Sequence, residues 1–165
     1  MDTYRHERIR EIPPTPGTAI DQVFTPADYR DCFLVETGDR YPTVADFASA
    51  YFLNQPRWLS LLSMNLASRK KLKAAIADAN GYQVDTAIGS WKVYNRTEEE
   101  IVFGDNMGFM EYRFSFRLDG AGFVEASTAV KYSWGGTGRF YFALVKPMHK
   151  RFVPISLRAA CTSMA

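Results

Sequence analysis

The sequence lacks an excess of charge of either sign. Twenty Lys and Arg side chains are balanced by eighteen Asp and Glu side chains among 165 residues, so the formal net charge is +2. Domains dedicated to nucleic-acid binding usually present a strongly basic stripe or patch. We therefore expect no nucleic-acid partner.

Cysteine and histidine are scarce as well. The two cysteines, Cys32 and Cys161, lie near opposite ends of the chain, and no CxxC pair occurs. This usage predicts reduced thiols in a cytoplasmic protein, with a single bridge between distant segments as the less favoured alternative. Only two histidines occur, His6 and His149, and no further histidine or paired carboxylate stands at ligand spacing. We expect no metal and no cofactor.

Long hydrophobic runs are also missing. The most apolar stretch, residues 140–157, is interrupted by Lys146, His149, Lys150 and Arg151. A membrane-spanning helix needs about 18 uninterrupted apolar residues, so we expect no stable membrane insertion. The charged first residues also lack the apolar segment of a secretory signal. We predict a cytoplasmic location.

Aromatic residues, by contrast, are abundant. Twelve Phe, nine Tyr and three Trp make up 15% of the chain, which is more ring surface than a domain of this length requires. Prolines are concentrated near the start, with six of the eight at or before Pro56. We therefore predict an extended arm over residues 1–27 and a single domain over residues 28–165.

Residues 31–86 predict one strand and two helices. The strand covers Asp31–Glu36, and Thr43 is a favourable N-cap for a short amphipathic helix that reaches Phe52. A second helix is predicted from near Pro56 to Asn80-Gly81. Its buried side is marked by Trp58, Leu61, Leu62, Leu66, Leu72 and Ile76.

From about Ala87 the hydrophobic period changes to two. Apolar residues from Met110 to Leu118 alternate with polar ones, which predicts a strand with one buried face and one face in water. The Asp119–Gly122 turn leads to a second alternating strand that ends at Trp134. Two earlier strands, 87–95 and 101–105, complete a predicted antiparallel meander.

The last segment predicts a long helix that covers the sheet. It follows the glycine-rich residues 135–138, and Pro147 and Pro154 are expected to bend or break it. Its predicted inward stripe consists of Tyr141, Leu144, Val145, Met148 and Phe152. The element order indicates an α+β fold in which an antiparallel sheet wraps around the C-terminal helix. This arrangement resembles the helix-grip fold of START-like and polyketide-cyclase-like proteins.

Two short motifs narrow this resemblance. Gly138-Arg139-Phe140-Tyr141 and Val145-Lys146-Pro147-Met148-His149 resemble the G-R-x-Y and V-x-P-x-H signature of a bacterial family of uncharacterised START-like (SRPBCC) domains. Members of that family occur alone or appended to reductases of the NAD-dependent epimerase type. Where the family favours His-Leu-Asp-Phe, this chain has Phe109-Met110-Glu111-Tyr112, so no role of that histidine transfers. The chain is also expected to have fewer strands than larger helix-grip proteins, and hence a smaller cavity.

The inward aromatic residues are the main candidate site. Their rings either pack a solid core or line a pocket for an apolar or aromatic small molecule. Tyrosines in the inward rows favour a pocket, because a buried hydroxyl needs a hydrogen-bond partner. The predicted ligand-binding residues are Trp91, Tyr112, Phe114, Thr128, Tyr132, Trp134, Tyr141, Met148 and His149.

Three functions remain open at this point. The first is binding of a small hydrophobic molecule between the sheet and the final helix. The second is a cyclase or dehydratase type of enzyme with His149 as acid or base and Tyr112, Tyr132 or Tyr141 orienting a polar group. A structural His149 that bonds a carbonyl freed by Pro147 is the favoured interpretation of that residue. The third is a protein-interaction module that uses the arm or the Tyr29–Phe33 strand edge. A homodimer is left open.

Overall fold

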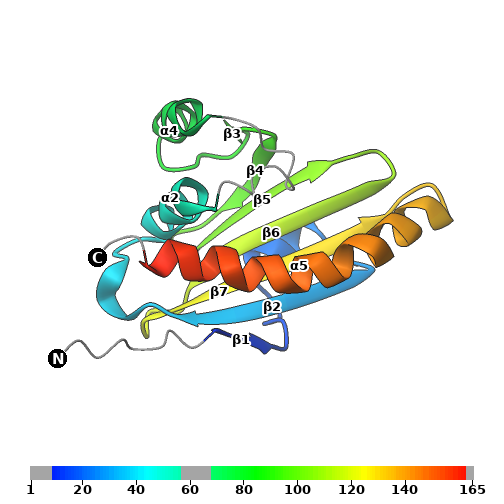
Figure 1. Cartoon of the computed structure of the whole chain (residues 1–165), viewed down its shortest axis with the longest axis horizontal. Helices are drawn as coiled ribbons and strands as arrows, with labels where there is room; N and C mark the ends of the chain where they lie inside the picture. Colours follow the sequence, from blue (N-terminus) through cyan, green and yellow to red (C-terminus); the bar gives the residue numbers. More distant parts are fainter. Residues whose placement is uncertain (1–8, 57–67, 163–165) are drawn as a thin grey trace.

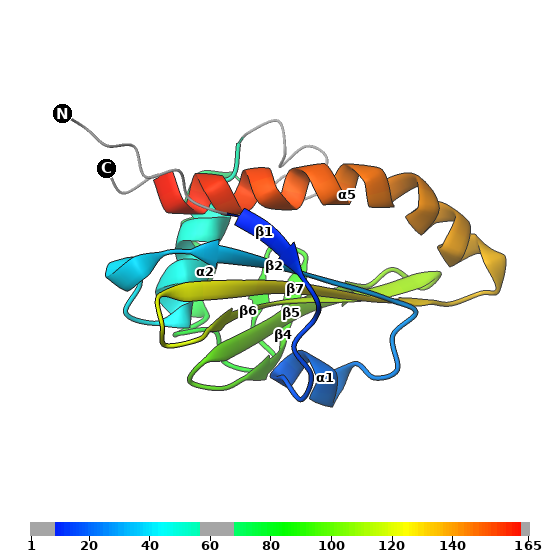
Figure 2. The same cartoon turned by 90° about the horizontal axis from the view of Figure 1, so that it is seen from below.

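A computed structural model describes residues 9–56 and 68–162 of the chain. In this part of the chain, seven strands form one antiparallel sheet in the order β1-β2-β7-β6-β5-β4-β3. The long helix α5 (Gly136–Thr162) crosses one face of the sheet, and the short helix α1 (Ala19–Val23) packs on the other face (Figure 1, Figure 2). The predicted α+β, helix-grip-like arrangement is therefore confirmed.

The sheet has more strands than expected. The strands are β1 (Ile9–Ile12), β2 (Tyr29–Glu36), β3 (Ala87–Ile88), β4 (Trp91–Arg96), β5 (Glu100–Asn106), β6 (Met110–Leu118) and β7 (Phe123–Tyr132). The expectation of a smaller sheet is wrong because two short strands lie at its edges. The single strand predicted over residues 87–95 is divided by Gly89, whose φ of +64° reverses the chain between β3 and β4.

The alternating pattern places β6 and β7 correctly. Phe114 pairs with Thr128 and Tyr112 pairs with Val130, so the even-numbered residues of both strands face α5. Asp119 stabilises the turn between them. Its Oδ1 accepts hydrogen bonds from the backbone N–H of Ala121 at 2.8 Å and from that of Phe123, the first residue of β7, at 3.0 Å. The hairpin is thus explained by the hydrogen bonds of Asp119 in the turn together with the two-residue alternation of both strands.

Helix α2 (Val44–Asn54) begins at Thr43, as predicted. The Thr43 hydroxyl accepts a hydrogen bond from the Asp46 backbone N–H, and the Asp46 carboxylate accepts one from the Thr43 backbone N–H. This reciprocal capping box fixes the start of the helix beside the 3₁₀ turn η1 (Gly38–Arg40). Of the second predicted helix, the structure contains α4 (Arg69–Asp78); Trp58, Leu61, Leu62 and Leu66 lie outside the described residues.

Residues 9–27 differ from the expected extended arm. Strand β1 pairs with β2, and the Glu100 carboxylate accepts hydrogen bonds from the backbone N–H groups of Ala19 and Ile20 at the start of α1. Strand β2 therefore lies between β1 and β7. Within the predicted Tyr29–Phe33 contact surface, Cys32 and Phe33 are paired on both sides, whereas the pairing with β1 does not extend to residues 29–31, so the interaction hypothesis stays a prediction.

The outer face of the sheet is less hydrated than the alternating pattern predicts. Helix α1 and Phe24 cover its centre and form a second small core with Val102 and Ala129. The Arg113 guanidinium is buried there, with its central carbon 4.7 Å from the Phe24 ring centroid and 3.5 Å from that of Tyr94. Arg113 is thus buried on the outer face by contacts with aromatic rings, which the alternation of apolar and polar residues along the strand does not reveal.

Helix α5 is continuous through both of its prolines. Figure 2 shows one bend, in the first half of the helix, and no break, so the expectation of a second bend or break is wrong for the half that contains Pro154. Two residues of the predicted inward stripe point away from the sheet: Leu144 is 62% exposed and Met148 is 40% exposed. The side that faces the sheet carries instead Gly138, Phe142, Val145, His149, Val153 and Leu157.

The main core fills only part of the space between the sheet and α5. Below α2, the Phe52 ring lies 5.1 Å from that of Phe103 and 5.3 Å from that of Trp91, with Phe47 and Phe116 in the same cluster. These rings pack tilted or edge to face, the arrangements that aromatic pairs favour. Part of the abundance of aromatic residues is therefore explained by their packing against one another next to α2. A cavity lies beside this cluster.

Candidate functional site

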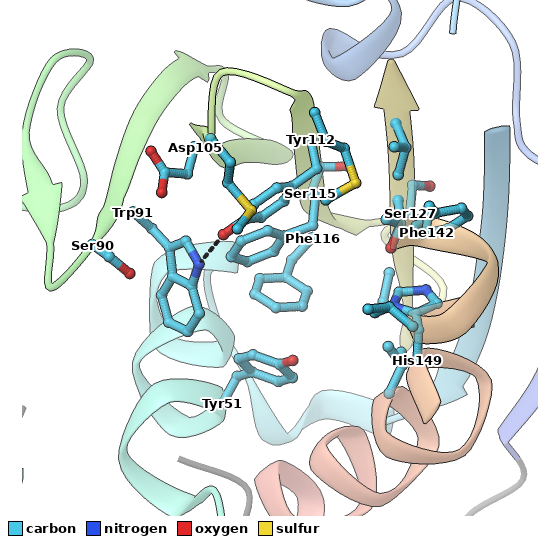
Figure 3. A pocket seen from close by; sticks show the side chains of 18 of the residues that line it. Tyr51, Ser90, Trp91, Asp105, Tyr112, Ser115, Phe116, Ser127, Phe142 and His149 are labelled. Carbon is cyan, nitrogen blue, oxygen red and sulfur yellow. Dashed lines mark hydrogen bonds between the residues drawn. The ribbon is translucent and has the colours of Figure 1, made fainter. Parts of the chain in front are cut away.

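A cavity of about 540 Å³ lies between the sheet and residues 141–157 of α5. Figure 3 shows Trp91 on one side of it and His149 on the other. Strands β6 and β7 form its floor, and α5 and α2 contribute the opposite wall. Among the lining residues, Ser90 and Tyr141 are exposed, so they mark where the cavity reaches the surface.

Most of the predicted site residues line this cavity. The structure brings six of the nine together: Trp91, Tyr112, Phe114, Thr128, Tyr141 and His149. The floor positions meet because β6 and β7 pair with their even-numbered residues on one face. Their placement fits the predicted pocket; their roles in binding stay predictions.

Three predicted site residues lie elsewhere. Trp134 follows the end of β7 with a φ of +56° and is 74% exposed. Met148 is on the outward side of α5, and the Tyr132 ring contacts Phe142 at 6.0 Å between centroids, outside the cavity lining. The alternating pattern was extended two residues too far in the case of Trp134, because the chain leaves the sheet after Tyr132.

A hydrogen bond between two aromatic residues defines one end of the cavity. The Trp91 indole Nε1–H donates to the Tyr112 hydroxyl at 2.8 Å (Figure 3). Burial raises the pKa of Tyr112 to about 12, and it raises the pKa of Tyr51, on α2, to about 12. Both hydroxyls are therefore neutral at physiological pH and act as hydrogen-bond donors or acceptors rather than as bases.

The other side of the cavity has a buried ionisable group behind it. Asp31 on β2 is 2% exposed, and its Oδ2 lies 3.0 Å from Nε2 of His149. The same oxygen accepts a hydrogen bond from the Tyr29 hydroxyl at 2.7 Å and lies 3.2 Å from Nζ of Lys150. Within the described part of the chain, Oδ1 of Asp31 has no hydrogen-bond partner.

These contacts set the charge on Asp31. Burial alone opposes ionisation of its carboxyl, but the hydrogen bonds from His149 and Tyr29 and the charges of His149 and Lys150 outweigh it, so the pKa of Asp31 lies below its ordinary value. An ionised Asp31 fixes the orientation of the His149 ring at the cavity wall. In the neutral form of the ring, Nε2–H donates to Asp31 and Nδ1 carries the lone pair.

The sequence did not single out Asp31. The sequence signal that could have identified it is its spacing of two and four residues from Phe33 and Val35. This spacing places the Asp31 carboxylate on the same inward face of β2 as these apolar side chains. Further lining residues not included in the predicted site are Tyr51, Met107, Met110, Phe142, Val145 and Val153.

Three further features concern metal ligands, cysteine thiols and membrane-spanning helices. Among residues 9–56 and 68–162, no group of three or more His, Cys, Asp and Glu side chains is placed to hold a metal ion. Cys32 and Cys161 are buried, and burial raises the pKa of Cys32 to about 11, which removes it as a nucleophile at neutral pH. None of the helices in the same residues is long and apolar enough to cross a membrane.

Comparison with known protein families gives one match over most of the domain. Residues 23–155 match a family described as protein of unknown function (DUF2867). The match begins within α1 and ends within α5, so it includes every strand except β1 and all of the cavity-lining residues except Leu157. No curated protein matches the chain. The chain therefore belongs to the DUF2867 family of proteins of unknown function.

Proposed function

We propose that the chain binds a small hydrophobic or aromatic molecule in the cavity between the sheet and α5. The observation that supports this proposal is the cavity of about 540 Å³ beside a buried aromatic cluster. Small-molecule sites are commonly about 300–1,000 Å³, mostly apolar, with a few polar groups at defined positions. Affiliation with START-like domains and a cytoplasmic location remain parts of this proposal, the first supported by the helix-grip-like fold.

The polar groups of the cavity indicate where a ligand would be oriented. The Tyr112 oxygen accepts from Trp91, which leaves its O–H to donate toward the cavity. Thr128 and His149 supply polar atoms on the other side, and apolar side chains such as Phe114 and Val145 lie among the lining between them. A ligand with an apolar body and hydrogen-bonding groups at its ends fits this distribution.

A matched pair of substitutions tests the proposal. Val145→Trp adds a large ring inside the cavity, whereas Leu144→Trp makes the same addition one position away, on the exposed side of α5. The probe is 1-anilinonaphthalene-8-sulfonate, whose fluorescence rises in apolar sites. We expect saturable binding to the wild type, an affinity about tenfold or more lower in Val145→Trp, and little change in Leu144→Trp. Equal affinities for all three folded proteins would contradict the proposal.

A second candidate function is acid–base catalysis on the bound molecule. The observation that favours it is the buried Asp31 carboxylate 3.0 Å from His149, which lines the same cavity as the hydroxyls of Tyr51 and Tyr112. A carboxylate that holds an imidazole in one tautomer is a recurrent arrangement for proton transfer. In this candidate, Nδ1 of His149 accepts a proton from the ligand and a neutral tyrosine hydroxyl orients a polar group.

Comparison of the wild type with His149→Gln tests catalysis separately from binding. A bacterial metabolite extract is incubated with each protein and its composition is followed by mass spectrometry. The candidate predicts that the wild type consumes at least one compound at a rate about 10²-fold or more above that of His149→Gln. An extract that remains unchanged with the wild type, or changes at the same rate with both, excludes His149 as acid or base.

A further inference from the structure

Exposed apolar side chains are concentrated on one part of the surface. The described residues contain seven large apolar side chains that are exposed, and five of them lie between residues 134 and 148. Trp134 is 74% exposed, Phe140 70% and Leu144 62%. Isolated apolar residues are normal on protein surfaces, but a contiguous group marks an interaction site.

These residues lie on the outward side of the first half of α5. Phe140, Leu144 and Met148 are four residues apart and therefore follow one another along the same side of the helix. Trp134 stands two residues before the start of the helix. We refer to Trp134, Phe140, Leu144 and Met148 as the α5 ridge. The opposite side of the helix faces the sheet, so the ridge is not part of the core or of the cavity wall.

The charged residues of helix α5 have one sign. Helix α5 contains five Lys and Arg residues and no Asp or Glu over its 27 residues. Arg139 and Arg151 are exposed next to Phe140 and Met148, and Lys146 is exposed with its ammonium 4.8 Å from the centroid of the Tyr29 ring. Lys150 differs from them, because its ammonium is paired with Glu11 and Asp31. The ridge is thus an apolar strip flanked by cations, although the whole chain is nearly neutral.

This combination selects among the surfaces that could cover the ridge. A symmetric contact with a second copy would bring the cations of one α5 close to those of the other, which is repulsive. An anionic lipid surface satisfies both features, since apolar side chains insert at the boundary between headgroups and acyl chains while Lys and Arg contact the headgroups. Tryptophan is also favoured at that boundary. We propose that the α5 ridge docks the protein on membranes that contain anionic lipids.

The docking is peripheral. No helix of the described residues spans a membrane, and the ridge extends along only part of α5. Tyr141, which lines the cavity and is exposed, belongs to the same helical turn as Phe140 and Leu144. The ridge therefore lies next to the cavity, but its docking does not depend on what the cavity binds.

Co-sedimentation of the full chain with vesicles tests the proposal. One set of vesicles is phosphatidylcholine alone, and the other contains phosphatidylcholine with phosphatidylserine. We expect binding to the second set, little binding to the first, and weaker binding at high salt because exposed charges are screened. The double variant Phe140→Ser, Leu144→Ser should bind about tenfold or more weakly, and Arg139→Gln, Arg151→Gln should lose about fivefold per charge.

A control variant separates the ridge from general surface apolarity. Val84→Ser changes an exposed apolar residue outside the ridge and should leave binding unchanged. Thermal unfolding checks that each variant is folded. The proposal is overturned if the folded wild type does not bind the phosphatidylserine vesicles, if it binds both sets equally, or if the double variant binds like the wild type. It is also overturned if light scattering shows a dimer that the double variant dissociates, since a second copy would then cover the ridge.

Discussion

Replacement of Asp31 by alanine is expected to lower the free energy of unfolding by about 3–5 kcal/mol. The carboxylate is 2% exposed and accepts from Tyr29 and His149 while it pairs with Lys150. Its removal leaves these donors without their shared acceptor in a buried environment. Chemical denaturation followed by circular dichroism measures the change.

Glu11→Gln is the matched control for this prediction. Glu11 also contacts Lys150, but its side chain is 54% exposed. An exposed ion pair contributes about 0–1 kcal/mol, so the control is expected to unfold nearly like the wild type. Equal destabilisation by both variants, or a loss below about 1 kcal/mol for Asp31→Ala, would contradict the assigned importance of the buried carboxylate.

The lowered pKa of Asp31 also predicts how stability depends on pH. A carboxyl whose pKa is lower in the folded than in the unfolded state contributes stability that is fully present above the unfolded-state pKa, about 3.9. That contribution is lost as pH falls through the lower, folded-state pKa. Asp31→Asn removes the group, so its difference in stability from the wild type should shrink as pH decreases below about 4.

Gly138→Ala is expected to destabilise the protein by about 1–3 kcal/mol, although alanine favours helices. A Cβ at residue 138 would lie 2.2 Å from the carbonyl oxygen of Phe109, which accepts a hydrogen bond from the backbone N–H of Ser133. The first turn of α5 must then move away from the start of β6. Because Tyr141 and Phe142 follow within one turn, ligand affinity should decrease together with stability.

Gly136→Ala tests whether this effect is local. Gly136 is in the same turn of α5, but no atom lies within 4 Å of the position of its added Cβ. We expect its free energy of unfolding to stay within about 0.5 kcal/mol of the wild type. If Gly138→Ala is as stable as Gly136→Ala in denaturant titrations, the close approach of α5 to β6 is not required.

The elements that the sequence predicts well are those with a local cause. Strands β6 and β7 follow from their alternation, and α2 follows from the capping sequence at Thr43. Strand β1 and helix α1 have four and five residues and depend on contacts far along the chain, such as the one between Ala19 and Glu100, 81 residues apart. The face of α5 was misjudged because apolar residues occur on both its sides, and only docking on the sheet shows which side is inside.

The candidate site was predictable to a similar extent. Tyr112, Phe114 and Thr128 belong to alternating strands, so their common face could be inferred. The pair of Asp31 and His149 could not, because these residues are 118 positions apart and meet only when β2 pairs with β7 below α5. Whether the interior is full or hollow also depends on tertiary packing, and the structure shows a filled aromatic end and a hollow one.

Native mass spectrometry of the purified protein tests the central proposal most directly. The cavity of about 540 Å³ is expected to retain a small apolar molecule from the expression host or to take one up on incubation with a lipid and metabolite extract. If the cavity binds one molecule, the mass of the wild type and of Leu144→Trp increases by that of one molecule per chain, and Val145→Trp shows no such increase. A wild type that stays at the mass of the bare chain after incubation with the extract would contradict the account.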